Sequence, residues 1–122
     1  MINKALEVAV DGTGHKQRLG CVVTDRRGRM IAAAHNIAKT HPLQHKYSTR
    51  VHRVKPFLHA EIAALVRCRA QPHTLYVARL KRDGSVGLAR PCPICEEAIR
   101  EAGVKRVVYT TNGGGTEEYI VR

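Results

Sequence analysis

Hydrophobic and polar residues in the first third of the chain follow spacings that predict one helix and two strands. Residues 2–10 are expected to form a short helix. Residues 19–24 and 29–34 have the pattern of strands, and the intervening DRRG sequence, which ends at Gly28, predicts a hairpin turn. The segment 35–56 is long for a connection inside a compact domain, which indicates a functional or partly helical loop.

A second helix is expected from His59 to about Arg69, because apolar residues recur there at helical spacing. Residues 74–80 then predict a strand, and the RDGSVG sequence after it predicts a turn or a flexible loop. The apolar stripe of the expected helix consists of Leu58, Ile62, Leu65 and Val66.

The last third of the chain predicts a third helix, from Pro91 to Ala102, which ends at Gly103. Residues 104–110 form a strongly apolar run and are expected to be a central strand. Residues 111–122 are expected to form a hairpin return strand or a mobile tail. Strands that alternate with helices indicate a layered α/β domain. The apolar stripe of this helix consists of Ile94, Cys95, Ala98, Ile99 and Ala102.

Composition predicts one cytoplasmic domain spanning residues 1–122. The 122 residues, 43% of them hydrophobic, suit a single core. No apolar run approaches the roughly 18 residues that span a bilayer, and the N-terminus lacks the apolar core of a signal peptide, so no membrane contact is expected. Four cysteines in a cytoplasmic chain are expected to be thiols or metal ligands. Two of them, Cys21 and Cys68, lie in apolar patterns and are expected to be small core residues.

The formal net charge of +11 is unevenly distributed along the chain. Between Gly12 and Ala60, ten Lys and Arg residues accompany a single acid, Asp25. A one-sided basic surface suggests a polyanion or a phosphorylated substrate as partner. A solubility effect or a general bias toward arginine is an equally good explanation, because the aromatic residues that stack on bases are scarce.

Cys92 and Cys95 form a C-x-x-C pair at the predicted start of the third helix. Pro91 precedes that helix and Pro93 lies in its first turn, which places Cys92 at the helix N-terminus, where the dipole lowers a thiol pKa. Cys95 points to the same side, so the two thiolates make half of a zinc site. A redox pair and a closed structural zinc site with two histidines are the alternatives.

His59 and Glu61, at the start of the second helix, complete an open metal site. With His59 as third ligand, the fourth position is left to water, which is the arrangement of catalytic zinc. Such a metal lowers the pKa of bound water. Glu61, two residues from a ligand, is then placed to transfer the proton of that water. Its alternative role is that of a favourable acid in a helix's first turn.

These residues resemble the signature of the zinc-dependent cytidine and deoxycytidylate deaminase superfamily, H-x-E followed by P-C-x-x-C. Here it reads His59-Ala60-Glu61 and Pro91-Cys92-Pro93-Ile94-Cys95, and the predicted elements follow the family's order over most of the chain. The resemblance implies a three-layer α/β/α fold around a mixed sheet of about five strands. It also implies Zn²⁺ held by the histidine and the two cysteines, and Glu61 as the proton-transferring group.

The resemblance implies further residues and leaves the substrate open. Asn36 matches an Asn that often contacts sugar or base, although a loop residue bonded to its own backbone is the alternative. The backbone N–H of Ala60 is a natural partner for the base carbonyl. His59 as first ligand is typical of the deoxycytidylate, tRNA-adenosine and polynucleotide branches. The short segment before EEYIVR instead favours an antiparallel final strand, as in the free-cytidine branch.

Three functions are consistent with these features. The favoured hypothesis is hydrolytic deamination of cytosine in a nucleoside or nucleotide, with the basic loop 35–56 binding phosphate. The second is deamination of cytosine or adenine in single-stranded DNA or RNA, with the basic surface following the backbone. The third is a non-catalytic zinc-stapled nucleic-acid-binding module, against which Glu61 argues. Members of the family usually associate, so a homo-oligomer is expected.

Overall fold

The computed structural model describes residues 1–12, 17–36 and 59–122. Its centre is a six-stranded sheet with strands in the order β2-β1-β3-β5-β6, and β4 pairs with β3 beside that path. The strands are β1 (Gln17–Thr24), β2 (Met30–His35), β3 (Thr74–Lys81), β4 (Val86–Gly87), β5 (Arg106–Thr110) and β6 (Thr116–Ile120). The helices are α1 (Ile2–Val10), α3 (Ala60–Val66) and α4 (Pro93–Glu101).

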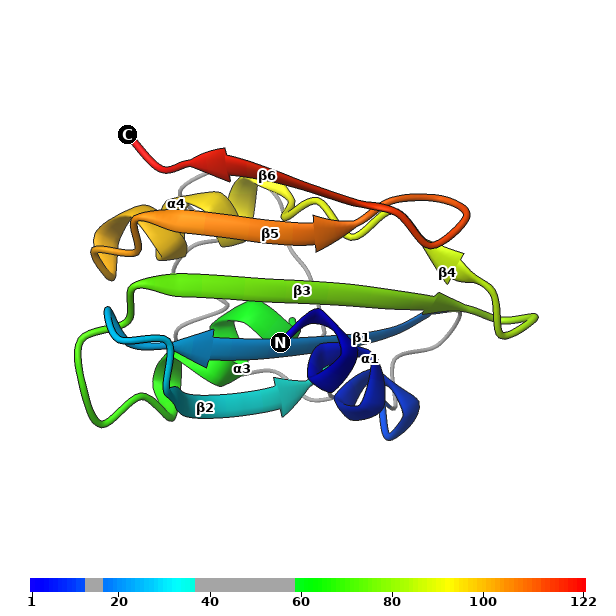
Figure 1. Ribbon diagram of the computed structural model, residues 1–122, viewed down its shortest axis with the longest axis horizontal. Helices are drawn as coiled ribbons and strands as arrows, with labels where there is room; N and C mark the ends of the chain where they lie inside the picture. Colours follow the sequence, from blue (N-terminus) through cyan, green and yellow to red (C-terminus); the bar gives the residue numbers. More distant parts are fainter. Residues whose placement is uncertain (13–16, 37–58) are drawn as a thin grey trace.

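The elements form three layers. In Figure 1, α1 lies in front of the sheet and α3 and α4 lie behind it. The α1 face is small, with a buried cluster of Ala5, Val22 and Ala78. The α3 and α4 face carries the main core, whose largest buried side chains include Ile62, Leu75, Ile94 and Ile99. The three-layer α/β/α fold that the resemblance implied is therefore confirmed.

The sheet is mixed, with one parallel pair among the strands that the structure describes. β3 and β5 run parallel, with Leu75 opposite Val107, whereas the other pairs are antiparallel. A parallel pair needs a crossover connection, and α4 lies within the one between β3 and β5. The last strand, β6, is antiparallel to β5, so residues 111–122 form the hairpin return strand and not a mobile tail.

Most predicted elements are confirmed, and the differences concern element ends. The helix predicted from His59 to Arg69 is shorter, because Arg67 is its C-cap and donates its N–H to the carbonyl of Ala64. Val66, placed on the apolar stripe from sequence, is therefore 47% exposed, which makes that assignment wrong. The third helix begins at Pro93 and ends at Glu101, two residues inside the predicted start and one inside the predicted end.

Two segments depart from the prediction in other ways. β4 was not predicted from the sequence, because it pairs through only two residues, Val86 with Leu80 and Gly87 with Arg79, too few to leave an alternating pattern. The basic loop 35–56 and Leu58 lie outside the described residues, apart from His35 and Asn36. Cys21 is buried in the main core, as predicted, and Cys68 packs against that core half-buried.

Gly20, on β1, is the point of closest approach between the sheet and α1. A Cβ atom there would lie 2.2 Å from the carbonyl oxygen of Ala5 and 2.5 Å from the backbone nitrogen of Ala9. Both atoms belong to the helix backbone and cannot rotate away, so any larger side chain must displace α1 from the sheet. We infer that the glycine is required by packing and not by backbone conformation.

We predict that Gly20→Ala lowers the free energy of unfolding by about 1–3 kcal/mol, the typical cost of overpacking. Gly87→Ala is the matched control, because a Cβ on that strand glycine would meet flexible side chains of Lys81 and Arg79 at 3.1–3.3 Å. Thermal unfolding of both variants measures the difference. Equal melting temperatures for the two would contradict the close approach of α1.

Candidate metal centre

The first turns of two helices bring His59, Cys92 and Cys95 together. His59 is the N-cap of α3 and Cys92 the N-cap of α4, both with extended backbone, and Cys95 follows in the first turn of α4. Pro93 occupies the first helical position, where its missing N–H costs no hydrogen bond. The predicted position of Cys92 at a helix start is confirmed. Two helix N-termini therefore face the same small volume.

The three side chains offer ligand atoms at separations that suit one ion. All three ligand atoms lie within 4.8 Å of one another. Nδ1 of His59 is 3.1 Å from Sγ of Cys95 and 3.5 Å from Sγ of Cys92. Tetrahedral Zn–N and Zn–S bonds of about 2.0–2.3 Å place their donor atoms roughly 3.6–3.8 Å apart. The donor set, one imidazole and two thiols, is also one that zinc prefers.

The pKa values of the two thiols are shifted in opposite directions, by a hydrogen bond for Cys92 and by burial for Cys95. The pKa of Cys92 is lowered to about 4, chiefly by a hydrogen bond from the Cys95 thiol and also by His59. The pKa of Cys95 is raised well above its ordinary value, chiefly by burial. The Cys92 thiolate is therefore available before a metal binds. The Cys95 thiol loses its proton when the metal binds to its sulfur, as is usual for cysteine ligands.

Glu61 lies beside this group but is not part of it. It is 4% exposed, in the first turn of α3. Burial raises its pKa, an effect that the charge of His59 and a hydrogen bond from the Cys95 thiol oppose. A carboxylate inside the main core is costly unless it is paired or used. Among the described residues, the group that could hold an ion contains the histidine and the two cysteines without this acid.

Asn36 and Ala60, the other two residues singled out from sequence, are both buried. Oδ1 of Asn36 accepts a hydrogen bond from Leu19 N–H at 2.9 Å, and Asn36 N–H donates to the Leu19 carbonyl. The amide thus extends the pairing of β1 with the chain after β2, where the alternative from sequence had it bonding its own backbone. Ala60 is the first residue of α3, so its N–H belongs to those that a helix leaves without an intrahelical partner.

An arginine next to the metal centre was missed by the sequence analysis. Arg90, two residues before Cys92, places its guanidinium carbon 4.7 Å from the ring centre of Tyr119 and 5.6 Å from that of Tyr109. Its Nη1 also donates to the Tyr109 hydroxyl at 3.0 Å. The only signal in the sequence is a charged residue directly before P-C-x-x-C, since the two tyrosines come together only through the pairing of β5 with β6.

Tyr119 contacts Arg90 through its ring and is influenced by the charge of the buried Glu61. Its hydroxyl is buried without a hydrogen-bond partner among the described residues. Its pKa is raised to about 12, chiefly by burial and by the charge of Glu96, with a further contribution from Glu61. The tyrosine therefore lies within electrostatic range of the buried carboxylate, and Arg90, which stacks on this tyrosine, precedes the ligand Cys92 by two residues.

Comparison with known families agrees with the geometry. Residues 1–111 match the family described as the cytidine and deoxycytidylate deaminase zinc-binding region. The chain belongs to this family, and its fold and its His-Cys-Cys group are those of a zinc-dependent deaminase. No individual curated protein matched the sequence. Among the described residues, no helix is long and apolar enough to cross a membrane.

We predict that Cys95→Ser loses most of its zinc and a large part of its stability, because metal-binding energy is folding energy at such sites. Cys68→Ser is the control: this thiol is half-buried, donates to the Ala64 carbonyl and lies outside the ligand group. Metal analysis and thermal unfolding on both purified variants make the test. Equal zinc content in the two would exclude Cys95 as a ligand.

Proposed function

We propose that this protein is a hydrolytic deaminase of cytosine in a pyrimidine nucleoside or nucleotide, with release of ammonia and formation of the uracil product. The observation that carries the proposal is Glu61, a buried carboxylate beside the three candidate ligands and outside their group. A structural zinc site has no use for such an acid. Bound at these ligands, Zn²⁺ supplies the Lewis acidity that makes water nucleophilic near neutral pH.

The proton transfers are assigned to Glu61. Its carboxylate takes a proton from the attacking water and gives it to the ring nitrogen of the base. It then takes the second proton from the hydroxyl group that has added to the base and gives it to the departing amine, as ammonia leaves and the carbonyl of the uracil product forms, so that one group serves both halves of the reaction. Its apolar surroundings favour this role, because burial raises its pKa toward the range in which a carboxyl group exchanges protons at neutral pH.

The base is proposed to be held by Ala60 and Asn36. The N–H of Ala60, at the start of α3, points away from the helix as a donor for the base carbonyl. Asn36 is proposed to contact the sugar or the base, from a backbone position fixed by its two bonds to Leu19. These contacts orient the substrate, and the burial of both residues favours a site from which water is largely excluded.

Arg90 is proposed to recognise the phosphate of a nucleotide substrate. Its guanidinium is exposed, yet it is held in place by stacking on Tyr119 and by the Tyr109 hydroxyl. A guanidinium held in this way loses little conformational entropy when it binds an anion. The alternative substrate, cytosine or adenine in single-stranded DNA or RNA, would present a phosphate at the same place and is separated by a substrate panel from nucleoside to oligonucleotide.

We predict that Glu61→Gln lowers the turnover number by about 10² to 10⁴-fold or more, the usual contribution of a general acid–base group. The amide keeps the shape of the side chain, so zinc content and melting temperature should remain close to those of the unchanged protein. Ammonia release and metal content are measured on the same preparation. Glu7→Ala, at an exposed acid paired with Lys4, is the control and should keep full activity.

Near-normal turnover by Glu61→Gln on every cytosine and adenine substrate would exclude the proposed mechanism. Loss of zinc together with activity would instead make Glu61 a structural residue of the metal centre. The control guards against a general effect of removing a negative charge from this basic protein.

We predict that Arg90→Gln lowers kcat/KM for a 5′-monophosphate roughly tenfold or more, in line with the loss of a charge-assisted hydrogen bond. For the corresponding nucleoside the change should be less than about threefold, since that substrate carries no phosphate for the guanidinium to bind. Arg82→Gln, at an exposed turn arginine, is the control. Equal losses on nucleoside and monophosphate would show that Arg90 only supports the two tyrosines.

A further inference from the structure

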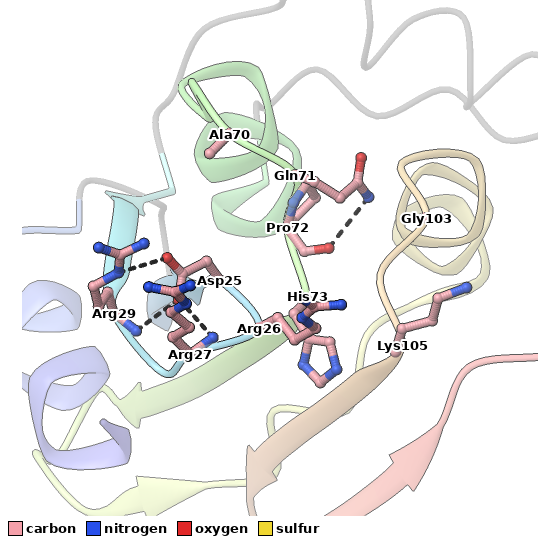
Figure 2. Close-up of a pocket in the computed structure, with 10 residues that line it drawn as sticks. All are labelled: Asp25, Arg26, Arg27, Arg29, Ala70, Gln71, Pro72, His73, Gly103 and Lys105. Atoms are coloured by element: carbon pink, nitrogen blue, oxygen red, sulfur yellow. Dashed lines mark hydrogen bonds and ion pairs between the residues drawn. The ribbon is translucent and has the colours of Figure 1, made fainter.

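A cavity lies at the opposite end of α3 and α4 from the metal centre. It has a volume of about 560 Å³. Figure 2 shows the turn Asp25–Arg29 on one flank, Gly103 and Lys105 on the other, and residues 70–73 between them. The zinc ligands occupy the first turns of the two helices, whereas this cavity follows their last turns. Helices of seven and nine residues separate the two places by about 10–14 Å of helix rise.

Backbone hydrogen bonds fix the walls of this cavity relative to one another. His73 N–H donates to the Thr24 carbonyl at 2.9 Å, and the His73 carbonyl accepts from Lys105 N–H at 2.9 Å. Nε2 of Gln71 donates to the Ala102 carbonyl at 2.9 Å. The turn after β1, the loop before β3 and the loop before β5 are therefore joined, so the cavity is preformed.

The cavity is strongly cationic. Four basic side chains and a single carboxylate, Asp25, line it. That carboxylate is already engaged: it accepts from Arg27 N–H and Arg29 N–H and pairs with the Arg29 guanidinium at 2.9 Å. The backbone N–H of Arg29 is the chief cause that lowers the pKa of Asp25. Among the described residues, Arg26, Arg27 and Lys105 pair with no carboxylate, so their charge is available to a ligand.

The remaining lining indicates more than a bare anion. Pro72 is buried and Ala70 is exposed beside it, which provides apolar contact area between the charged flanks. His73 lines the same wall, and its ring is oriented by a 2.8 Å contact between Nδ1 and the Thr74 hydroxyl. A cavity of several hundred Å³ that combines apolar lining residues with cationic flanks suits a planar group that carries phosphate.

We propose that this cavity is a second, non-catalytic site for a phosphate ester, occupied by a free nucleotide or by one nucleotide of a single strand. Arg26 and Arg27 bind the phosphate, and Lys105, on the opposite flank, adds positive charge to the cavity. The site is separate from the metal centre, because it shares no lining residue with the zinc ligands, with Glu61 or with Arg90.

The test measures binding by calorimetry on the zinc-loaded protein, with two probes that carry no exocyclic amine to deaminate. Uridine triphosphate represents a free nucleotide, and a ten-residue oligothymidylate represents a strand. We expect the double variant Arg26→Gln/Arg27→Gln to bind the probe with an affinity roughly tenfold lower or more, because charged hydrogen bonds to phosphate are lost. Both arginines are exposed turn residues, so the fold and the basal deamination rate should not change.

Arg82→Gln/Arg122→Gln is the matched control, with the same change of charge at two exposed arginines outside the cavity. If Arg26→Gln/Arg27→Gln loses triphosphate binding and the control variant keeps it, the site is assigned to a free nucleotide. If only oligothymidylate binding is lost, the site is assigned to a strand. In that case the slope of log K against log salt concentration should become shallower by about 0.7 for each phosphate contact removed. Equal effects of the two double variants, or an Arg90→Gln effect without an Arg26→Gln/Arg27→Gln effect, would overturn the proposal.

Discussion

The meeting of two helix N-termini at one point is the constraint on which the rest of this structure depends. His59 and Cys92 each end an extended segment and begin a helix, and their ligand atoms must arrive within a few ångströms of each other. Neither helix is long enough to be stable alone. Their relative position comes from the sheet beneath them, because side chains of both helices pack with Leu75 and Val107 in one buried core.

Glu61 has an energetic cost that the fold bears at this point. A helix in the main core would be more stable with an apolar residue at that position, because a buried carboxylate loses its hydration. Its neighbours compensate only in part, through the charge of His59 and the thiol of Cys95. Local rules of stability are most often broken where a protein needs reactivity, and the role proposed for Glu61 would explain why this position breaks them.

The chemistry of the site was more predictable from sequence than its surroundings, for a physical reason. Pro93 and Cys92 define a helix start by local geometry alone, and Gly103, with a positive φ of 82°, ends the same helix. Local signals of this kind act within a few residues. The stacking of Arg90 on Tyr119 and the cavity behind the helices depend on strand pairing and on loops far apart in the chain, which no local pattern encodes.

The same distinction explains the errors of detail. The last turn of α3 ends at Val66 because Arg67 closes it with its own N–H, a choice that hydrophobic spacing does not reveal. β4 consists of only two residues, Val86 and Gly87, which is too short a strand to show a periodic pattern in the sequence. Where tertiary contacts set an element's length, sequence reasoning identifies the element but not its end.

α3 and α4 both extend from the metal centre to the cationic cavity. Each is a short rigid rod with its first turn in the metal centre and its last turn beside a preformed cationic cavity. If the cavity binds a ligand as proposed, a displacement of the last turns would also act on the first turns. Thermodynamic linkage makes any such effect reciprocal. A ligand of the cavity that raised the affinity for zinc would itself bind the zinc-loaded protein with an affinity higher by the same factor.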